Sequence, residues 1–244
     1  MGTAIVVTSG KGGTGKTSIT GGVAGSLARL GHSVLCIDMD IGLRNLDISL
    51  GLSDRALMDF SDVAEGRCPL VRAAVNHPDL PGLALLTAPM TLSPALTEEA
   101  VRRMLDTARS LYDYVLIDSP AGLGAGFRMA CCGADRAIVV STNDASSLRD
   151  AQRTVGELDF LRQIHLVMNR IQPKLLRQLR TTIDDAMDAA GLPLIGVIPE
   201  DRRVILAANM GRPLILEGRR GAANACLNIA KRIEGHRVPV MRIR

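Results

Sequence analysis

Aromatic side chains are scarce in this sequence. Its 244 residues include no Trp, two Tyr and three Phe, although 47% are hydrophobic. The core must therefore consist of Val, Ile, Leu, Ala and Met, which suits the buried strands of a parallel sheet. A chain of this length can bury roughly 70–75% of its unfolded surface. We expect one domain, residues 1–235, followed by a short basic tail, residues 236–244.

Cysteines are few, and no two of them form a C-x-x-C pair, so neither a zinc site nor a disulfide scaffold is indicated. The five are Cys36, Cys68, Cys131, Cys132 and Cys226. Long apolar runs are also missing, since none approaches the ~20 residues that span a bilayer. The N-terminus carries no secretory signal. These absences predict a cytoplasmic protein with reduced thiols.

The excess of positive charge is small. There are 29 Lys and Arg residues against 25 Asp and Glu residues, a formal net charge of +4. For a chain of this size such an excess favours polyanion partners only weakly. Ordinary solvated faces are the simpler interpretation, and nucleic acid is not an expected partner.

Short apolar runs alternate with longer amphipathic segments along the chain. This alternation is typical of repeated strand–helix units, and it predicts an α/β fold with a mostly parallel β-sheet and helices on both faces. We expect strands at 4–8, 33–38, 83–87, 114–118, 136–141, 164–169 and 194–199. We expect helices at 16–30, 97–111, 146–160, 173–190, 202–209 and 218–234. The segments 60–82 and 122–126, rich in Pro and Gly respectively, are predicted to be loops.

The stretch "SGKGGTGKTS", residues 9–18, follows the first apolar run and precedes the first predicted helix. Gly10, Gly15, Lys16 and Thr17 fit the G-x-x-x-x-G-K-[ST] phosphate loop in the strand-to-helix context that the pattern requires. Backbone N–H groups of such a loop surround the β-phosphate, its lysine reaches the β- and γ-phosphates, and its hydroxyl binds Mg²⁺. The predicted nucleotide-binding residues here are Gly12, Gly13, Thr14, Gly15, Lys16, Thr17 and Ser18.

Three aspartates follow apolar runs. Asp38 ends "VLCID", Asp40 comes two residues later, and Asp118 ends "YVLID". Carboxylates at strand ends beside a phosphate loop can hold Mg²⁺ or orient the attacking water. A single such aspartate could equally cap a turn. Three of them near one phosphate loop favour the metal and water roles.

Six segments together resemble the MinD family, the septum-site-determining ATPases of the MinD/ParA group. The resemblance extends from about residue 3 to residue 240, and "DIGLRNLD" is more specific to it than the phosphate loop. It implies a P-loop NTPase fold and a dimerising ATP switch for placing the division septum. The segments are "GKGGTGKTS", "DMDIGLRNLDISLGL", "YDYVLIDSPAGLGAGF", "GADRAIVVS", "VMNRIQP" and "GVIPEDRRVILAANMGRPLI".

The resemblance also assigns roles to single residues. In this family the first lysine of the loop, here Lys11, crosses to the nucleotide of the partner subunit in an ATP-bound dimer. Such a cation stabilises the charge on the phosphates only when two subunits meet. The family pattern further implies that Lys16 binds the phosphates, that Thr17, Asp38 and Asp118 serve the Mg²⁺, and that Asp40 handles the attacking water.

Two further segments match positions that lie around the adenine in this family. They contain Asn169 and Arg170 in "VMNRIQP", and Pro199, Glu200 and Asp201 in "IPED". Amide and backbone groups at strand ends can read the edge of a base. Asn169 could also simply favour a turn.

The resemblance implies partners and has two departures. An ATP-state homodimer, a division inhibitor of the MinC type and a topological regulator are expected. Gly124 stands where MinD sequences commonly carry an acidic residue. The given sequence stops without the usual amphipathic anchoring helix, so we expect membrane association to be weak or supplied by a partner, with the inner face of the cell membrane as a second location.

Two other classes remain open from the sequence. One is a ParA-like ATPase of DNA segregation, whose ATP-bound dimer would bind DNA without sequence preference and with strong salt dependence. The other is an iron–sulfur scaffold with a similar loop, which would need cysteines able to bridge a cluster. The adjacent Cys131 and Cys132 fit that requirement poorly.

Overall fold

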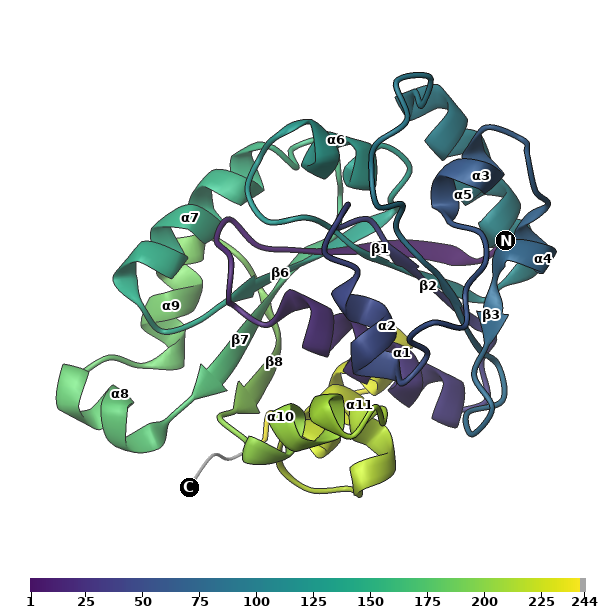
Figure 1. Cartoon of the computed structure of the whole chain (residues 1–244). Coiled ribbons are helices and arrows are strands. Elements are labelled where there is room, and N and C mark those ends of the chain that lie inside the picture. Colours follow the sequence, from purple (N-terminus) through teal and green to yellow (C-terminus); the bar gives the residue numbers. More distant parts are fainter. Residues whose placement is uncertain (242–244) are drawn as a thin grey trace.

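Within residues 1–241, eight strands form one sheet in the order β3-β4-β2-β5-β1-β6-β7-β8 (Figure 1). The structure is a computed structural model that describes residues 1–241. All neighbouring strands are parallel except β3, which runs antiparallel to β4 at the edge. The strands are β1 (Thr3–Thr8), β2 (Val34–Asp38), β3 (Val75–Asn76), β4 (Leu83–Leu86), β5 (Tyr114–Asp118), β6 (Arg136–Ser141), β7 (Ile164–Ile171) and β8 (Leu194–Pro199).

Helices cover both faces of this sheet (Figure 1). The core on one face includes residues of α3, α5, α6, α7 and α9, and the core on the other includes residues of α1, α2, α10 and α11. The helices are α1 (Lys16–Arg29), α2 (Asn45–Leu50), α3 (Phe60–Ala64), α4 (Leu70–Ala73), α5 (Glu98–Leu111), α6 (Ala125–Cys131), α7 (Ala145–Gly156), α8 (Pro173–Leu179), α9 (Ile183–Ala190), α10 (Arg202–Asn209) and α11 (Gly221–Ile233), with a 3₁₀ turn at Leu214–Glu217.

The central strand β1 has apolar side chains on both of its faces. Ala4 and Val6 pack into one core, whereas Ile5 and Val7 pack into the other. Successive side chains of a strand point to opposite faces, and both faces are covered by helices here. The predicted α/β fold with helices on both faces of a mostly parallel sheet is therefore confirmed.

The seven predicted strands are all present, but three predicted segments differ. The expected loop 60–82 contains α3, α4 and the edge strand β3, and α3 begins with a capping box in which Asp59 and Asp62 satisfy each other's backbone N–H groups. The expected loop 122–126 leads into α6, with Gly124 as its N-cap. The expected helix 173–190 is divided into α8 and α9 at Arg180, whose φ is 52°.

The C-terminal segment 236–241 has no helix or strand and packs back along α11. Arg232 of α11 donates from Nε and Nη2 to the carbonyl of Val238 and from Nη2 to that of Pro239. Asn224, nearer the start of α11, lies 3.7 Å from the sulfur of Met241. Within the described residues, no helix is both long and apolar enough to cross a membrane.

The chain reverses its direction across the sheet at β1. This strand lies between β5 and β6: the chain forms β2 to β5 on one side of it, and then crosses over to form β6, β7 and β8 in outward order on the other side. Ligands of open α/β sheets bind at such a switch point, beyond the carboxyl ends of the strands. The segments after β1, β2, β5, β7 and β8 meet at this edge.

Candidate nucleotide site

The phosphate loop connects β1 to α1, and its backbone requires glycine at particular places. Gly15 is the residue before α1 and has a φ of 90°, a left-handed conformation that side chains disfavour. A Cβ at Gly15 would also overlap the Nδ2 atom of Asn169. A Cβ at Gly10 would overlap the backbone of Asp150 in α7. The loop is thus held between β7 and α7 in a shape that only glycine permits.

Asn169 anchors this loop. It lies in β7, is 7% exposed, and donates from Nδ2 to the carbonyl of Thr14 over 2.7 Å. The side chain expected to read adenine therefore also binds the backbone of the loop. Asn169 lines the adjoining pocket as well, so it lies between the two parts of the site.

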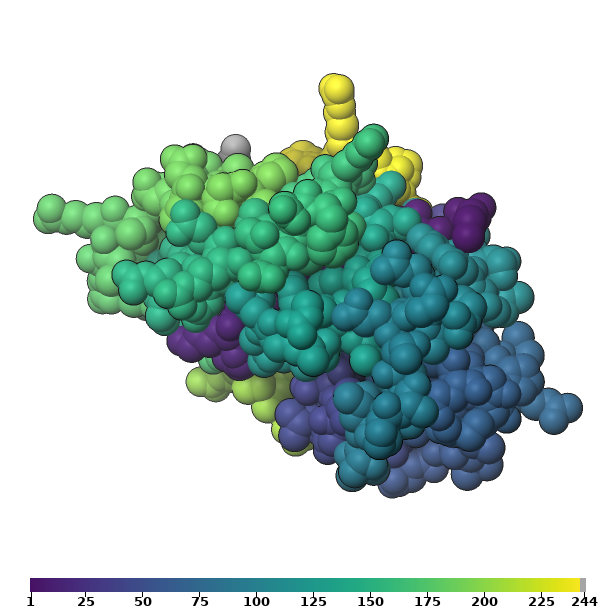
Figure 2. Space-filling view, turned by 90° about the horizontal axis from the view of Figure 1, so that it is seen from above, coloured from purple at the N-terminus to yellow at the C-terminus, as the bar shows by residue number. Residues whose placement is uncertain are grey.

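The two lysines of the loop occupy different surroundings. Lys16, the first residue of α1, is 7% exposed, and its charge acts on the carboxyls of both Asp40 and Asp118. Lys11 is exposed and donates from Nζ to Ser146 Oγ of α7 over 3.1 Å. Figure 2 shows atoms of the phosphate-loop segment at the surface beside α7. Only Lys16 faces the carboxylates.

Asp38 and Asp118 are neighbours at the ends of β2 and β5, where their Cα atoms are paired in the sheet register. Each is 1% exposed. Burial raises the pKa of Asp38 to about 6, although the N–H groups of Asp40 and Leu46 donate to it and oppose the change. Burial likewise raises the pKa of Asp118 to about 7, and the nearby Asp38 adds to the increase.

Hydroxyl groups of α1 lie beside the acidic corner formed by Asp38 and Asp118. Thr20 donates to Asp118 Oδ1 over 3.1 Å, and the Thr17 side chain also hydrogen-bonds to Asp118. Asp40, two residues beyond the end of β2, is half-buried. Burial raises the pKa of Asp40, and the charge of Lys16 opposes that change. Two buried carboxylates, a threonine hydroxyl and a lysine form a set of oxygen ligands and positive charge that suits Mg²⁺ with a phosphate chain.

Residues 1–241 contain no cluster of three or more His, Cys, Asp or Glu side chains that could hold a metal without other ligands. Proteins bind Mg²⁺ at nucleotide sites through one or two carboxylates together with phosphate oxygens. Thr17, Asp38 and Asp118 fit that role as a partial ligand set.

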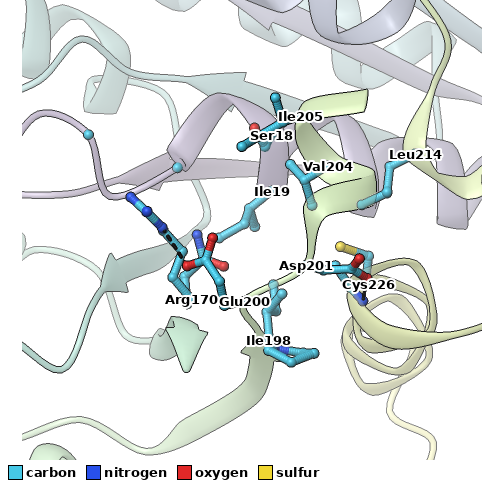
Figure 3. Close-up of a pocket in the computed structure, with 15 residues that line it drawn as sticks. Ser18, Ile19, Arg170, Ile198, Glu200, Asp201, Val204, Ile205, Leu214 and Cys226 are labelled. Carbon is cyan, nitrogen blue, oxygen red and sulfur yellow. Dashed lines mark hydrogen bonds and ion pairs between the residues drawn. The ribbon is translucent and has the colours of Figure 1, made fainter. Parts of the chain in front are cut away.

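A pocket of about 220 Å³ adjoins the loop (Figure 3). Its lining contains all five residues predicted around the adenine, namely Asn169, Arg170, Pro199, Glu200 and Asp201. Its apolar lining was not identified from the sequence, because those residues come from five elements, namely α1, β8, α10, the 3₁₀ turn and α11. They are Ile19, Ile198, Val204, Leu214 and Cys226.

Three charged residues of this pocket are already engaged within the protein. Arg170 donates from Nε to Glu200 Oε2 over 2.8 Å, and the pair lies on one side of the pocket in Figure 3. Asp201, on the other side, caps α10, pairs with Arg203 and accepts from the N–H of Ala222 in α11. Asp201 therefore joins α10 to α11, and this contact positions the wall of the pocket.

Comparison with known proteins identifies the family. Residues 5–214 match the CobQ/CobB/MinD/ParA nucleotide binding domain. The septum site-determining protein MinD of Synechocystis sp. is 40% identical over 242 residues, which cover 97% of this chain and 91% of that protein. MinD of Bacillus subtilis is 41% identical over 246 residues, which cover 98% and 92%. This chain belongs to the MinD family.

Solved MinD structures share the fold. The chain matches a MinC:MinD complex of Aquifex aeolicus with a TM-score of 0.91 and 37% identity over 98% of each chain. It matches MinD complexed with Mg-ADP from Pyrococcus horikoshii with a TM-score of 0.84 and 27% identity over 96% of each chain. A ParA family ATPase from Chlorobium tepidum, at 21% identity, shows the fold alone. The predicted MinD resemblance, P-loop NTPase fold and role in septum placement are thus confirmed, and the ParA alternative has less support.

Proposed function

We propose that this MinD-family protein is an ATP-dependent dimerising switch for division-septum placement. It binds ATP with Mg²⁺, dimerises, recruits a division inhibitor of the MinC type, and returns to the monomer after hydrolysis to ADP and phosphate. The naming of MinC together with MinD in the Aquifex aeolicus complex supports this kind of partner. A topological regulator that stimulates hydrolysis completes the cycle, and membrane association is weak or supplied by a partner.

The observation that carries the proposal is the separation of the two lysines. Lys16 lies inside the site near Asp40 and Asp118, so one subunit already supplies the lysine that its own phosphates need. Lys11 is exposed on the outer side of the loop at Ser146. A cation at the surface can reach a second subunit's nucleotide, and hydrolysis then depends on dimerisation.

The remaining residues divide the work within one subunit. Backbone N–H groups from Gly12 to Ser18 surround the phosphates at the start of α1. Thr17, Asp38 and Asp118 hold Mg²⁺, which neutralises charge on the β- and γ-phosphate oxygens when bound. Asp40 orients the attacking water or accepts its proton.

The base lies in the pocket of about 220 Å³. The apolar walls of this pocket exclude water from the faces of the adenine ring. Asn169, Arg170 and residues Pro199 to Asp201 contact the polar edge of the ring.

The test compares two variants of the loop. We expect Lys16→Ala to abolish tight ATP binding, whereas Lys11→Ala binds ATP but forms no ATP-dependent dimer and does not hydrolyse it. Calorimetry gives the affinity, light scattering with ATP or ADP gives the mass, and phosphate release gives the rate. Lys174→Ala, an exposed lysine outside the site, is the control. Wild-type turnover in Lys11→Ala would refute the role across subunits.

A further inference from the structure

Thr20 lies in the second turn of α1 and is 0% exposed. The phosphate-loop pattern ends at Thr17 and assigns no role to this residue. The hydroxyl oxygen of Thr20 lies 3.0 Å from the carbonyl oxygen of Lys16 and 3.1 Å from Oδ1 of Asp118. A hydroxyl group has a single proton, so it can donate a full hydrogen bond to only one of these two acceptors.

The carboxyl group of Asp118 needs this proton more than the carbonyl of Lys16 does. In an α-helix the N–H of each residue donates to the carbonyl four residues earlier, so the carbonyl of Lys16 already has a donor in the N–H of Thr20. Asp118 is 1% exposed and forms no ion pair within residues 1–241. Because a metal ligand of this type is a carboxylate, and hydrogen bonds to charged oxygens are about twice as strong as neutral ones, the hydroxyl serves Asp118.

The sheet fixes the backbone of Asp118 on both sides. Its Cα atom is paired with that of Val7 in β1 and with that of Asp38 in β2. The N–H of Met39 donates to its carbonyl over 3.0 Å, and the N–H of the next residue, Ser119, donates to the carbonyl of Val7 over 3.1 Å. Only the side-chain torsions of Asp118 remain free, so hydrogen bonds to the carboxyl group determine its direction.

Two threonines on one face of α1 reach this carboxyl group. The Thr17 side chain also hydrogen-bonds to Asp118, and residues three apart in a helix lie on the same face. Thr17 is the residue whose hydroxyl oxygen the phosphate-loop pattern assigns to Mg²⁺. Thr20 is further from the phosphate-binding end of α1, so it can hold Asp118 while the oxygen of Thr17 remains available to the metal.

We propose that Thr20 is a positioning residue for the metal site, and that its hydroxyl orients the carboxylate of Asp118 for Mg²⁺. The inference rests on the proposed function, because it takes Thr17 and Asp118 to serve the Mg²⁺ of the bound nucleotide. Thr20 is absent from the lining of the nucleotide pocket, so it acts through Asp118. Removal of a group that orients a metal ligand typically lowers metal affinity by about 10- to 100-fold.

Ser26 offers a matched control in the same helix. It is also 0% exposed, and its hydroxyl donates to the carbonyl of the residue four positions earlier, Gly22, over 2.6 Å. Among residues 1–241 this hydroxyl contacts no carboxylate. Ser26→Ala therefore measures the loss of a buried helix hydroxyl that has no part in the metal site.

The experiment measures Mg²⁺ affinity of the full chain by calorimetry, with the protein in excess over ADP so that all ADP is bound. We expect Thr20→Val, which keeps the shape of the side chain but lacks the hydroxyl, to raise the Mg²⁺ dissociation constant about tenfold or more. The ADP affinity measured in EDTA, which reports the phosphate loop without metal, changes less than about twofold. Thr20→Ser keeps the hydroxyl and should restore Mg²⁺ affinity, and Ser26→Ala should leave it unchanged.

A double-mutant cycle tests whether Thr20 acts through Asp118. In the Asp118→Asn background, Thr20→Val should change Mg²⁺ affinity less than about twofold further, because the carboxylate that Thr20 orients is gone. An equal loss in both backgrounds overturns the proposal.

The outcomes separate this inference from the proposed function. If the wild-type protein with ADP does not bind Mg²⁺, the proposed metal site is wrong and the role of Thr20 falls with it. If the wild type binds Mg²⁺ and Thr20→Val binds it equally well, only the role of Thr20 is overturned. A fall in ADP affinity in EDTA as large as the fall in Mg²⁺ affinity would assign Thr20 to the shape of the loop and also overturn it.

Discussion

Replacing Asn169 with alanine tests whether this side chain positions the phosphate loop. Its Nδ2 atom donates to the carbonyl of Thr14 over 2.7 Å, and the side chain is 7% exposed. Alanine removes the donor in a place that water reaches poorly. The same Nδ2 atom lies where a side chain at Gly15 would be, so the amide also fills the space beside the loop.

The size of the effect follows from the buried carbonyl. A buried acceptor that loses its donor costs roughly 1–3 kcal/mol. If the phosphate loop of the free variant leaves its bound conformation, binding of phosphate must restore that conformation. The affinity for the phosphate ligand then falls by about 5- to 150-fold. A positioning role predicts the same loss for ATP and for inorganic tripolyphosphate, because both occupy the loop. A role in reading adenine predicts a loss for ATP alone.

Calorimetry with both ligands at constant Mg²⁺ distinguishes these cases. The control is Asn209→Ala in α10, since that exposed asparagine makes a similar bond, from Nδ2 to the carbonyl of Ile205 over 3.0 Å, and should leave tripolyphosphate binding unchanged. A thermal melt of each variant shows whether the fold is intact. Unchanged tripolyphosphate affinity in Asn169→Ala, with weaker ATP binding, would refute the positioning argument.

Three further predictions concern the loop, the carboxylates and the tail. Gly15→Ala should weaken ATP binding because its left-handed φ of 90° and the contact with the Asn169 amide oppose a Cβ, whereas Gly156→Ala, with open space around it, should not; equal affinities would contradict this. Burial raises the pKa of Asp38 to about 6 and that of Asp118 to about 7, both well above the 3.8 expected of an unfolded chain. The folded state therefore binds protons more tightly between pH 4 and 7, so the nucleotide-free protein should lose stability as the pH rises through this range. Melting temperatures should be higher at pH 6 than at pH 8, and an undiminished difference in Asp118→Asn would count against the explanation. The chain as given should bind anionic vesicles weakly with ATP or ADP, because a few arginines without a large apolar face make a poor anchor; strong ATP-dependent co-sedimentation that is lost on truncation after residue 235 would show that the tail is an anchor.

Local sequence patterns predicted helices and strands correctly where the capping residues and the apolar spacing indicated the same element. The side chain of Thr97 accepts from the N–H of Ala100 and caps α5, and Gly191 ends α9 with a φ of 68°, so these two ends agree with the helix limits predicted near residues 97 and 190. The division of 173–190 was missed although Thr182 and Asp185 form a capping box. That signal was weaker than the helical pattern around it, and α6 was missed because the glycines before it favoured a loop.

Much of the acidic corner at the carboxyl ends of β2 and β5 was predictable from the sequence for a geometric reason. Lys16 and Thr17 are adjacent in a recognisable loop, and Asp38 and Asp118 each end an apolar run. Parallel strands bring their carboxyl ends to one edge of the sheet, so residues 80 positions apart in the chain become paired neighbours in the register. Chain order and strand direction were sufficient to place these groups together.

Only the tertiary structure decided what surrounds that corner. The apolar lining of the pocket beside the loop comes from five elements that share no sequence pattern, and the different directions of Lys11 and Lys16 depend on the packing of α7 against the loop. The leucines of α8 have the spacing of a helix that packs into a core, yet no residue of α8 is buried in the folded protein. Such features depend on contacts between distant segments, and a short-range pattern of residues carries no information about which segments will meet.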